Sequence, residues 1–128
     1  MSERSPHDHS GEQLQPFESK EAYTAYVDRI FKDLETERSP MIVDAEANEL
    51  LLLALRHQEF TPTERLRELN LVSHLAMIRL RGFVQPGADP NVVSRAEFIH
   101  NAYAQVYGQT MLELAKQEDV TSVFQRNL

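Results

Sequence analysis

Residues 50–55 read Leu-Leu-Leu-Leu-Ala-Leu, and this run restricts the folds that the chain can adopt. Leucine and alanine favour helix, and the run lacks the β-branched residues that a strand prefers. A helix that is apolar all the way round has to be covered on more than one side. In a chain of 128 residues, other helices of the chain or a partner subunit must supply that cover. The run therefore predicts a central helix in an all-α bundle.

Two helices are expected in the first half of the chain, where apolar residues recur at i, i+3 and i+4. The first runs from about Ser19, a suitable N-cap, to Glu37. We expect Pro40 to separate the two helices, because a proline pushes the preceding residue out of the α region. The second helix begins at Asp44 as its N-cap, extends to about His57 and contains the leucine run.

The third predicted helix has the clearest local signal in the chain. Thr61 and Glu64 form a capping box, with a proline at the first helical position between them. The helix is expected to run to Arg81 and to stop at Gly82, because glycine is common just after the last residue of a helix. Its apolar band is broad enough to contact two neighbours.

The fourth predicted helix begins at Pro90 or at Ser94 and reaches Lys116 or beyond. Gly108 interrupts its apolar stripe, and a glycine inside a helix costs about 1 kcal/mol relative to alanine. We therefore expect another helix to approach closely at Gly108. A last short helix is expected from the apolar residues Val120, Val123 and Phe124.

Residues 1–16 are polar and contain two prolines and a glycine, so we expect a disordered N-terminal arm. Residues 17–128 are expected to form a single helical domain, in which short connections favour antiparallel neighbours. The predicted fold is all-α, with four main helices in a mostly antiparallel bundle. No apolar segment approaches the roughly 20 residues of a membrane span, and the polar start is unlike a signal peptide. We expect a cytoplasmic protein that does not bind a membrane.

Composition excludes several classes of site. The chain contains no cysteine, so it has no disulfide, thiol nucleophile or thiolate metal ligand. Its net charge of −7 disfavours binding to nucleic acid at long range. Only residues 51–88 are net basic, with five basic and three acidic side chains. There is no glycine-rich phosphate loop and no serine on a glycine-flanked nucleophile elbow, so we expect a protein that is not an enzyme.

Glu97 and His100 form a pair at i, i+3 that projects from one side of the fourth predicted helix. The spacing resembles that of the ferritin-like di-metal bundles, which implies iron, manganese or zinc as the bound metal. Such a site needs two copies of the pair, and this chain has one. Glu49 on the second helix and a dimer axis would have to complete it. The alternative is that Glu97 forms a capping box with Ser94, while His100 is a hydrogen-bonded core or interface histidine.

Residues 61–82 also allow a helix-turn-helix hypothesis for nucleic-acid binding. Residues 70–72 would be the turn, and Arg79 and Arg81 would face phosphates or bases. Against this, the supposed recognition helix reads His-Leu-Ala-Met-Ile-Arg-Leu, which leaves few polar side chains for base contacts. The alternative is one continuous amphipathic helix with its arginines on the solvent side.

The apolar stripes of the later helices are wider than one neighbour covers, and this favours a surface for a protein partner. Tyrosine is enriched in protein interfaces because it has a polar tip on an apolar body. We expect the interface on the fourth helix at Tyr103, Tyr107, Gly108 and Met111. The sequence thus predicts a non-catalytic interaction protein without a cofactor, either an accessory or regulatory subunit or a homo-oligomer such as a dimer. The metal-binding bundle and the nucleic-acid regulator are the alternatives.

Overall fold

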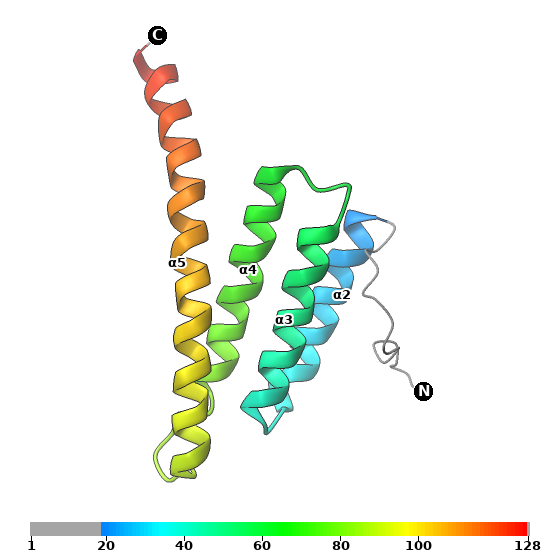
Figure 1. Cartoon of the computed structure of the whole chain (residues 1–128), viewed down its shortest axis with the longest axis vertical. Helices are drawn as coiled ribbons and strands as arrows, with labels where there is room; N and C mark the ends of the chain where they lie inside the picture. Colours follow the sequence, from blue (N-terminus) through cyan, green and yellow to red (C-terminus); the bar gives the residue numbers. More distant parts are fainter. Residues whose placement is uncertain (1–18, 128) are drawn as a thin grey trace.

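The computed structural model describes the backbone of residues 19–127 and the side chains of residues 19–117. It confirms the all-α fold, and no strand occurs among these residues. Successive helices run in opposite directions (Figure 1). The predicted arm at residues 1–16 lies outside the described part of the chain. The helical elements are α2 (Lys20–Asp33), a short 3₁₀ turn η1 (Leu34–Thr36), α3 (Pro40–Arg56), α4 (Pro62–Arg81) and α5 (Pro90–Asn127).

Prolines begin three of the four helices. At α4 the predicted capping box is confirmed, since Glu64 N donates to Thr61 Oγ1 at 3.1 Å and Thr61 N donates to Glu64 Oε1 at 2.9 Å. The second predicted helix was placed too late, because α3 begins at Pro40 rather than Asp44. Proline has no backbone N–H to leave unsatisfied and its φ suits the first helical position, so Pro40 starts a helix here instead of separating two.

α5 is one unbroken helix of 38 residues. It passes through Gly108 without interruption, and the short last helix expected around Val120 is instead the final part of α5. At 1.5 Å per residue α5 is about 57 Å long, whereas α4 is about 30 Å long. Figure 1 shows the C-terminal part of α5 extending past the end of the other helices. Within the described residues, no helix is both long and apolar enough to cross a membrane.

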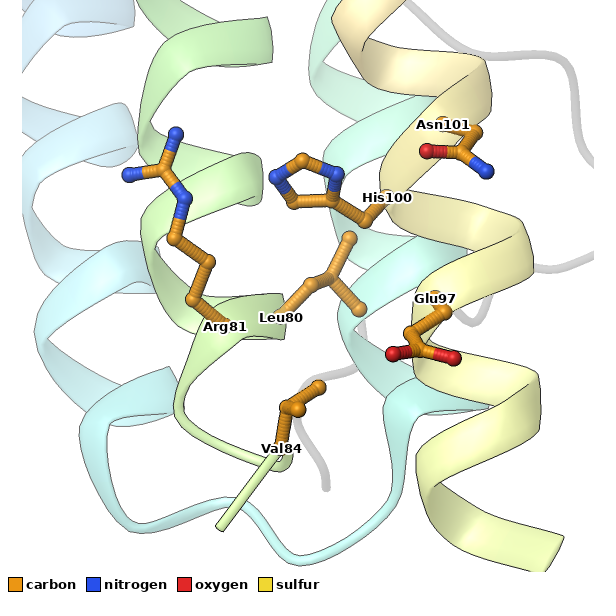
Figure 2. Close-up of a pocket in the computed structure, with 6 residues that line it drawn as sticks. All are labelled: Leu80, Arg81, Val84, Glu97, His100 and Asn101. Carbon is orange, nitrogen blue, oxygen red and sulfur yellow. The ribbon is translucent and has the colours of Figure 1, made fainter.

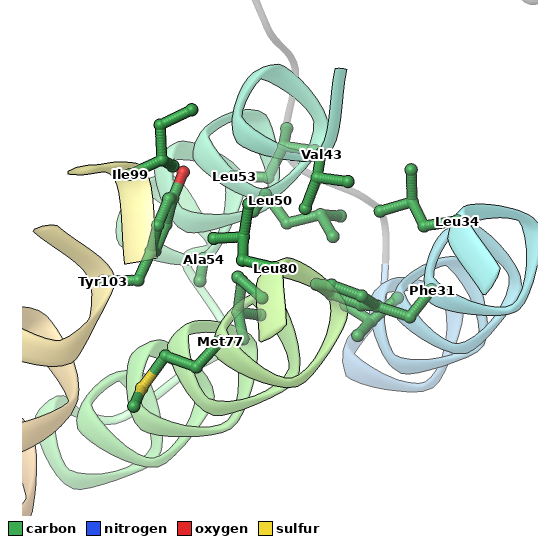
Figure 3. Packing of buried hydrophobic residues seen from close by; sticks show 14 of the residues in the cluster. Phe31, Leu34, Val43, Leu50, Leu53, Ala54, Met77, Leu80, Ile99 and Tyr103 are labelled. Atoms are coloured by element: carbon green, nitrogen blue, oxygen red, sulfur yellow. The ribbon is translucent and has the colours of Figure 1, made fainter. Parts of the chain in front are cut away.

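The core lies between the four helices, and α4 contacts each of the others, most extensively α5. The leucine run is only partly enclosed. Leu50 and Leu53 are buried, but Leu55 on the outer side of α3 is 50% exposed. The expectation of a helix covered all the way round, with α3 at the centre, is therefore wrong, because α3 packs on one side and α4 lies between α2 and α5. Figure 3 shows part of this core, including Phe31, Val43, Leu50, Leu53, Leu80, Ile99 and Tyr103.

Buried polar groups connect the helices at specific points. The Tyr23 hydroxyl of α2 donates to Leu50 O of α3 at 2.9 Å. Burial raises the pKa of this hydroxyl far above its usual range, so it remains a donor. His57 is buried at the end of α3, where its Nδ1 accepts from Glu59 N at 3.2 Å. Its Nε2 therefore carries the proton and donates to Ser19 O at 3.2 Å, which holds the start of α2 against the α3–α4 connection.

Candidate functional site

Glu97 and His100, the predicted metal ligands on α5, lie in one pocket between the end of α4 and the first half of α5 (Figure 2). The pocket has a volume of about 410 Å³. Glu49 of α3 does not line it, so two of the three predicted ligands come together. The described part of the chain holds no group of three or more His, Cys, Asp or Glu side chains that could bind a metal ion. A site completed by a second copy stays a prediction.

The polar side chains of this pocket come from both helices. In Figure 2 the His100 imidazole points from α5 toward α4, where the Arg81 guanidinium lies. His100 Nε2 is buried and has no hydrogen-bond partner among the described residues, although the alternative interpretation expected one. The proposed capping box of Ser94 and Glu97 is wrong, because α5 already begins at Pro90. The residue before it, Asp89, caps the helix by accepting from Asn91 N at 2.8 Å.

The helix-turn-helix hypothesis is wrong in its fold, because α4 is continuous from Pro62 to Arg81. Asn70, placed in the expected turn, remains helical and donates through its Nδ2 to Thr110 Oγ1 of α5 at 3.0 Å. Arg79 points at α2, where its Nη2 donates to Phe31 O at 3.0 Å. This arginine therefore contacts the protein's own backbone.

The predicted interface residues fall into two groups. Tyr103 is 5% exposed and faces α3, where its hydroxyl donates toward Asp44 O at 2.9 Å and Asp44 Oδ1 at 2.8 Å. Burial and the neighbouring Asp44 carboxylate raise the pKa of Tyr103 far above its usual range. Tyr107 is half-buried, while Gly108 and Met111 are exposed. The last three are thus accessible, whereas Tyr103 belongs to the core.

One exposed apolar surface joins α4 and α5. On α4, Leu71 and Ile78 are two turns apart on the same helix face, and His74 lies between them. The His74 ring stacks on Tyr107 of α5, with ring centroids 5.2 Å apart and an interplanar angle of 28°. Met111 follows one turn after Tyr107 and is 44% exposed. We call these five residues the α4–α5 surface.

Sequence reasoning found only the α5 half of this surface. Tyr107 and Met111 were predicted as interface residues, whereas His74 was missed because a lone helical histidine has no distinctive pattern. The sequence placed Leu71 and Ile78 in the broad apolar band of this helix without assigning them to the interface, and their spacing of seven residues puts them on one face beside the inward-facing Val72 and Ala76. Arg67 and Arg81 stand one turn beyond Leu71 and Ile78, so the apolar part of α4 has a cationic residue at each end.

Comparison of the chain with protein-family models, curated proteins and solved structures found no significant match.

Proposed function

We propose that this chain is a non-catalytic interaction protein that binds another protein through the α4–α5 surface. The observation that carries the proposal is the exposure of Leu71, Ile78 and Met111 around the His74–Tyr107 stack. Contiguous apolar side chains on a surface mark contact sites more often than isolated ones do. Aromatic residues and methionine are also the types enriched in the buried centre of protein interfaces.

The flanking charges indicate what kind of partner fits. Arg67 and Arg81 are exposed at the two ends of the apolar stripe on α4. A partner helix with an apolar centre and acidic residues at its ends would complement this arrangement. Contacts at such a rim mainly guide orientation and association rate, while the apolar centre supplies most of the affinity.

Charged substitutions test this surface directly. Ile78→Glu places a carboxylate within this surface, and Leu55→Glu is the matched control on the exposed outer side of α3. Both positions are at least one-third exposed, so circular dichroism should show the same helix content in both variants. We expect affinity purification or light scattering of the full chain to show a complex that Ile78→Glu loses and Leu55→Glu retains. Two results together contradict the proposal: the wild-type chain stays monomeric at every concentration, and it binds no protein whose binding Ile78→Glu abolishes.

A further inference from the structure

The outward side of α5 carries a continuous seam that the bundle does not use. Its members are separated alternately by four and three residues, the spacing at which the helices of a coiled coil meet, and Phe98, Leu112 and Ala115 are its apolar members. All are exposed, and none is ionisable. They lie about half a turn away from Ile99 and Tyr103, which face the core. The outer seam consists of Ser94, Phe98, Asn101, Gln105, Gly108, Leu112 and Ala115.

Folding of the single chain does not explain this seam. Phe98 is 75% exposed, the largest exposed fraction among the exposed large hydrophobic residues. Gly108 lies inside a helix, where glycine costs about 1 kcal/mol relative to alanine. Among the described residues, a Cβ at Gly108 would meet no atom within 4 Å, so no other described helix approaches there. The close approach expected from the sequence is thus absent among the residues that the structure describes, and a second molecule would supply it.

We propose that the outer seam binds a second copy of this chain, with the two α5 helices antiparallel about a two-fold axis at Gln105. The inference rests on the proposed function, because it names one partner of an interaction protein, but it uses a different face of α5. A two-fold interface requires one patch to be complementary to itself. Phe98 and Leu112 each lie seven residues from Gln105, so each packs against the other in the partner.

The remaining layers of the seam match in size. Asn101 precedes Gln105 by four residues and Gly108 follows it by three, so the longer amide of one copy meets the glycine of the other. Ser94 and Ala115, both small, meet at the two ends of the seam. The central layer is formed by Gln105 and its symmetry mate, whose side-chain amides can donate to and accept from each other.

Charge and area indicate a reversible dimer. Each copy carries a net charge of −7, so two copies repel at long range. No seam residue is ionisable, so the line of contact itself brings no like charges together. The seam spans about 33 Å of helix, which corresponds to a total buried area on the order of 1,000 Å², near the lower limit for a specific interface. Higher salt screens the repulsion and should strengthen the dimer.

Sedimentation of the full chain tests this arrangement with two variants of equal charge. Gln105→Glu places two carboxylates on the two-fold axis, whereas Gln58→Glu makes the same chemical change in the exposed α3–α4 connection. We expect wild type and Gln58→Glu to associate alike, and Gln105→Glu to weaken association by about tenfold or more through like-charge repulsion. Equal association of all three proteins overturns the inference, as does a wild type that is monomeric at every concentration. Loss of association by Ile78→Glu but not by Gln105→Glu also overturns it, while supporting the proposed function.

Cross-linking tests the antiparallel orientation, and the absence of cysteine from the chain makes single substitutions unambiguous. We expect Gln105→Cys to form an interchain disulfide, and a mixture of Ser94→Cys and Ala115→Cys chains to form a mixed one. Asn48→Cys, exposed on α3, reports random collisions. Efficient cross-linking of Ser94→Cys with itself indicates parallel helices and overturns the arrangement, as does cross-linking at Gln105 no faster than at Asn48.

Discussion

The inner and outer faces of α5 belong to one helix but differ in burial and in contacts. On the inner face, Ile99 and Tyr103 are buried and hydrogen bonds of Tyr103 join α5 to α3. On the outer face, Phe98 and Leu112 are exposed. The fold explains the identity of the inner residues but not the absence of ionisable residues from the outer seam. The comparison teaches that an exposed face can be informative through the residue types it lacks.

The largest expected effect contrasts two aromatic residues of α5. Tyr103→Ala removes a buried ring together with its hydrogen bonds to Asp44 and should lower the free energy of unfolding by about 3–5 kcal/mol. Phe98→Ala removes a ring that is mostly in solvent, so we expect a change within about 0.5 kcal/mol. Urea denaturation at a concentration where the protein is monomeric measures both. Comparable destabilisation by the two substitutions would remove the distinction between the faces.

A smaller effect is expected at Gly108 on the outer face. Gly108→Ala should raise the free energy of unfolding by about 0.5–1 kcal/mol, because alanine favours helix and its Cβ meets nothing within 4 Å. Gly82→Ala is the control, because the added Cβ would lie 3.2 Å from Arg79 O. We expect this substitution to raise the free energy of unfolding less. Thermal denaturation of the two variants gives the comparison. A destabilised Gly108→Ala would show that this glycine has a role within the chain.

The smallest expected effect comes from Glu68 of α4, a packed side chain that lacks the hydrogen bonds of Tyr103. Its Oε1 is buried with no partner among the described residues. Burial raises the pKa of Glu68, and the carboxylates of Asp28 and Glu64 raise it further. A raised carboxyl pKa means that the folded state binds the proton more tightly than the unfolded state does. The free energy of unfolding therefore falls as the pH rises and Glu68 loses its proton.

Glu68→Gln removes that titration and should make the protein slightly more stable than wild type at pH 7. The advantage should shrink as the pH falls toward 4, where the wild-type carboxyl is increasingly protonated. Melting temperatures of both proteins between pH 4 and pH 7 provide the measurement, and Glu59→Gln at an exposed position is the control. A pH-independent difference would show that the carboxylate charge is not the cause.

Local signals predicted the fold well. The capping box at Thr61, the stop at Gly82 and the single helix through Tyr103 depend on residues close in sequence, and each is present in the structure. The N-cap of α3 was placed five residues late, at Asp44 instead of Ser39, because the same proline signal suits both a break and a first helical position. The central role given to the leucine run failed because periodicity does not show how many neighbours a helix has.

The candidate site was less predictable, because it depends on contacts between helices. The sequence pattern grouped Tyr103 with Tyr107, and only the structure shows that one faces Asp44 and the other stacks on His74. The outer seam was hidden for a different reason. A repeat of 3.5 residues is hard to distinguish from the inner apolar stripe, which repeats every 3.6 residues on the same helix. The seam residues Asn101 and Gln105 are also polar, so they do not stand out in an apolar pattern.

The extensive packing of α5 on α4 also has a consequence for how the molecule is made. α5 follows the other three helices in the chain, and most of its packing is against α4. A ribosome therefore releases α2, α3 and α4 before the helix that encloses them exists. Until α5 emerges, the side of α4 that packs on it stays uncovered, so the four-helix packing can form only after α5 has been made.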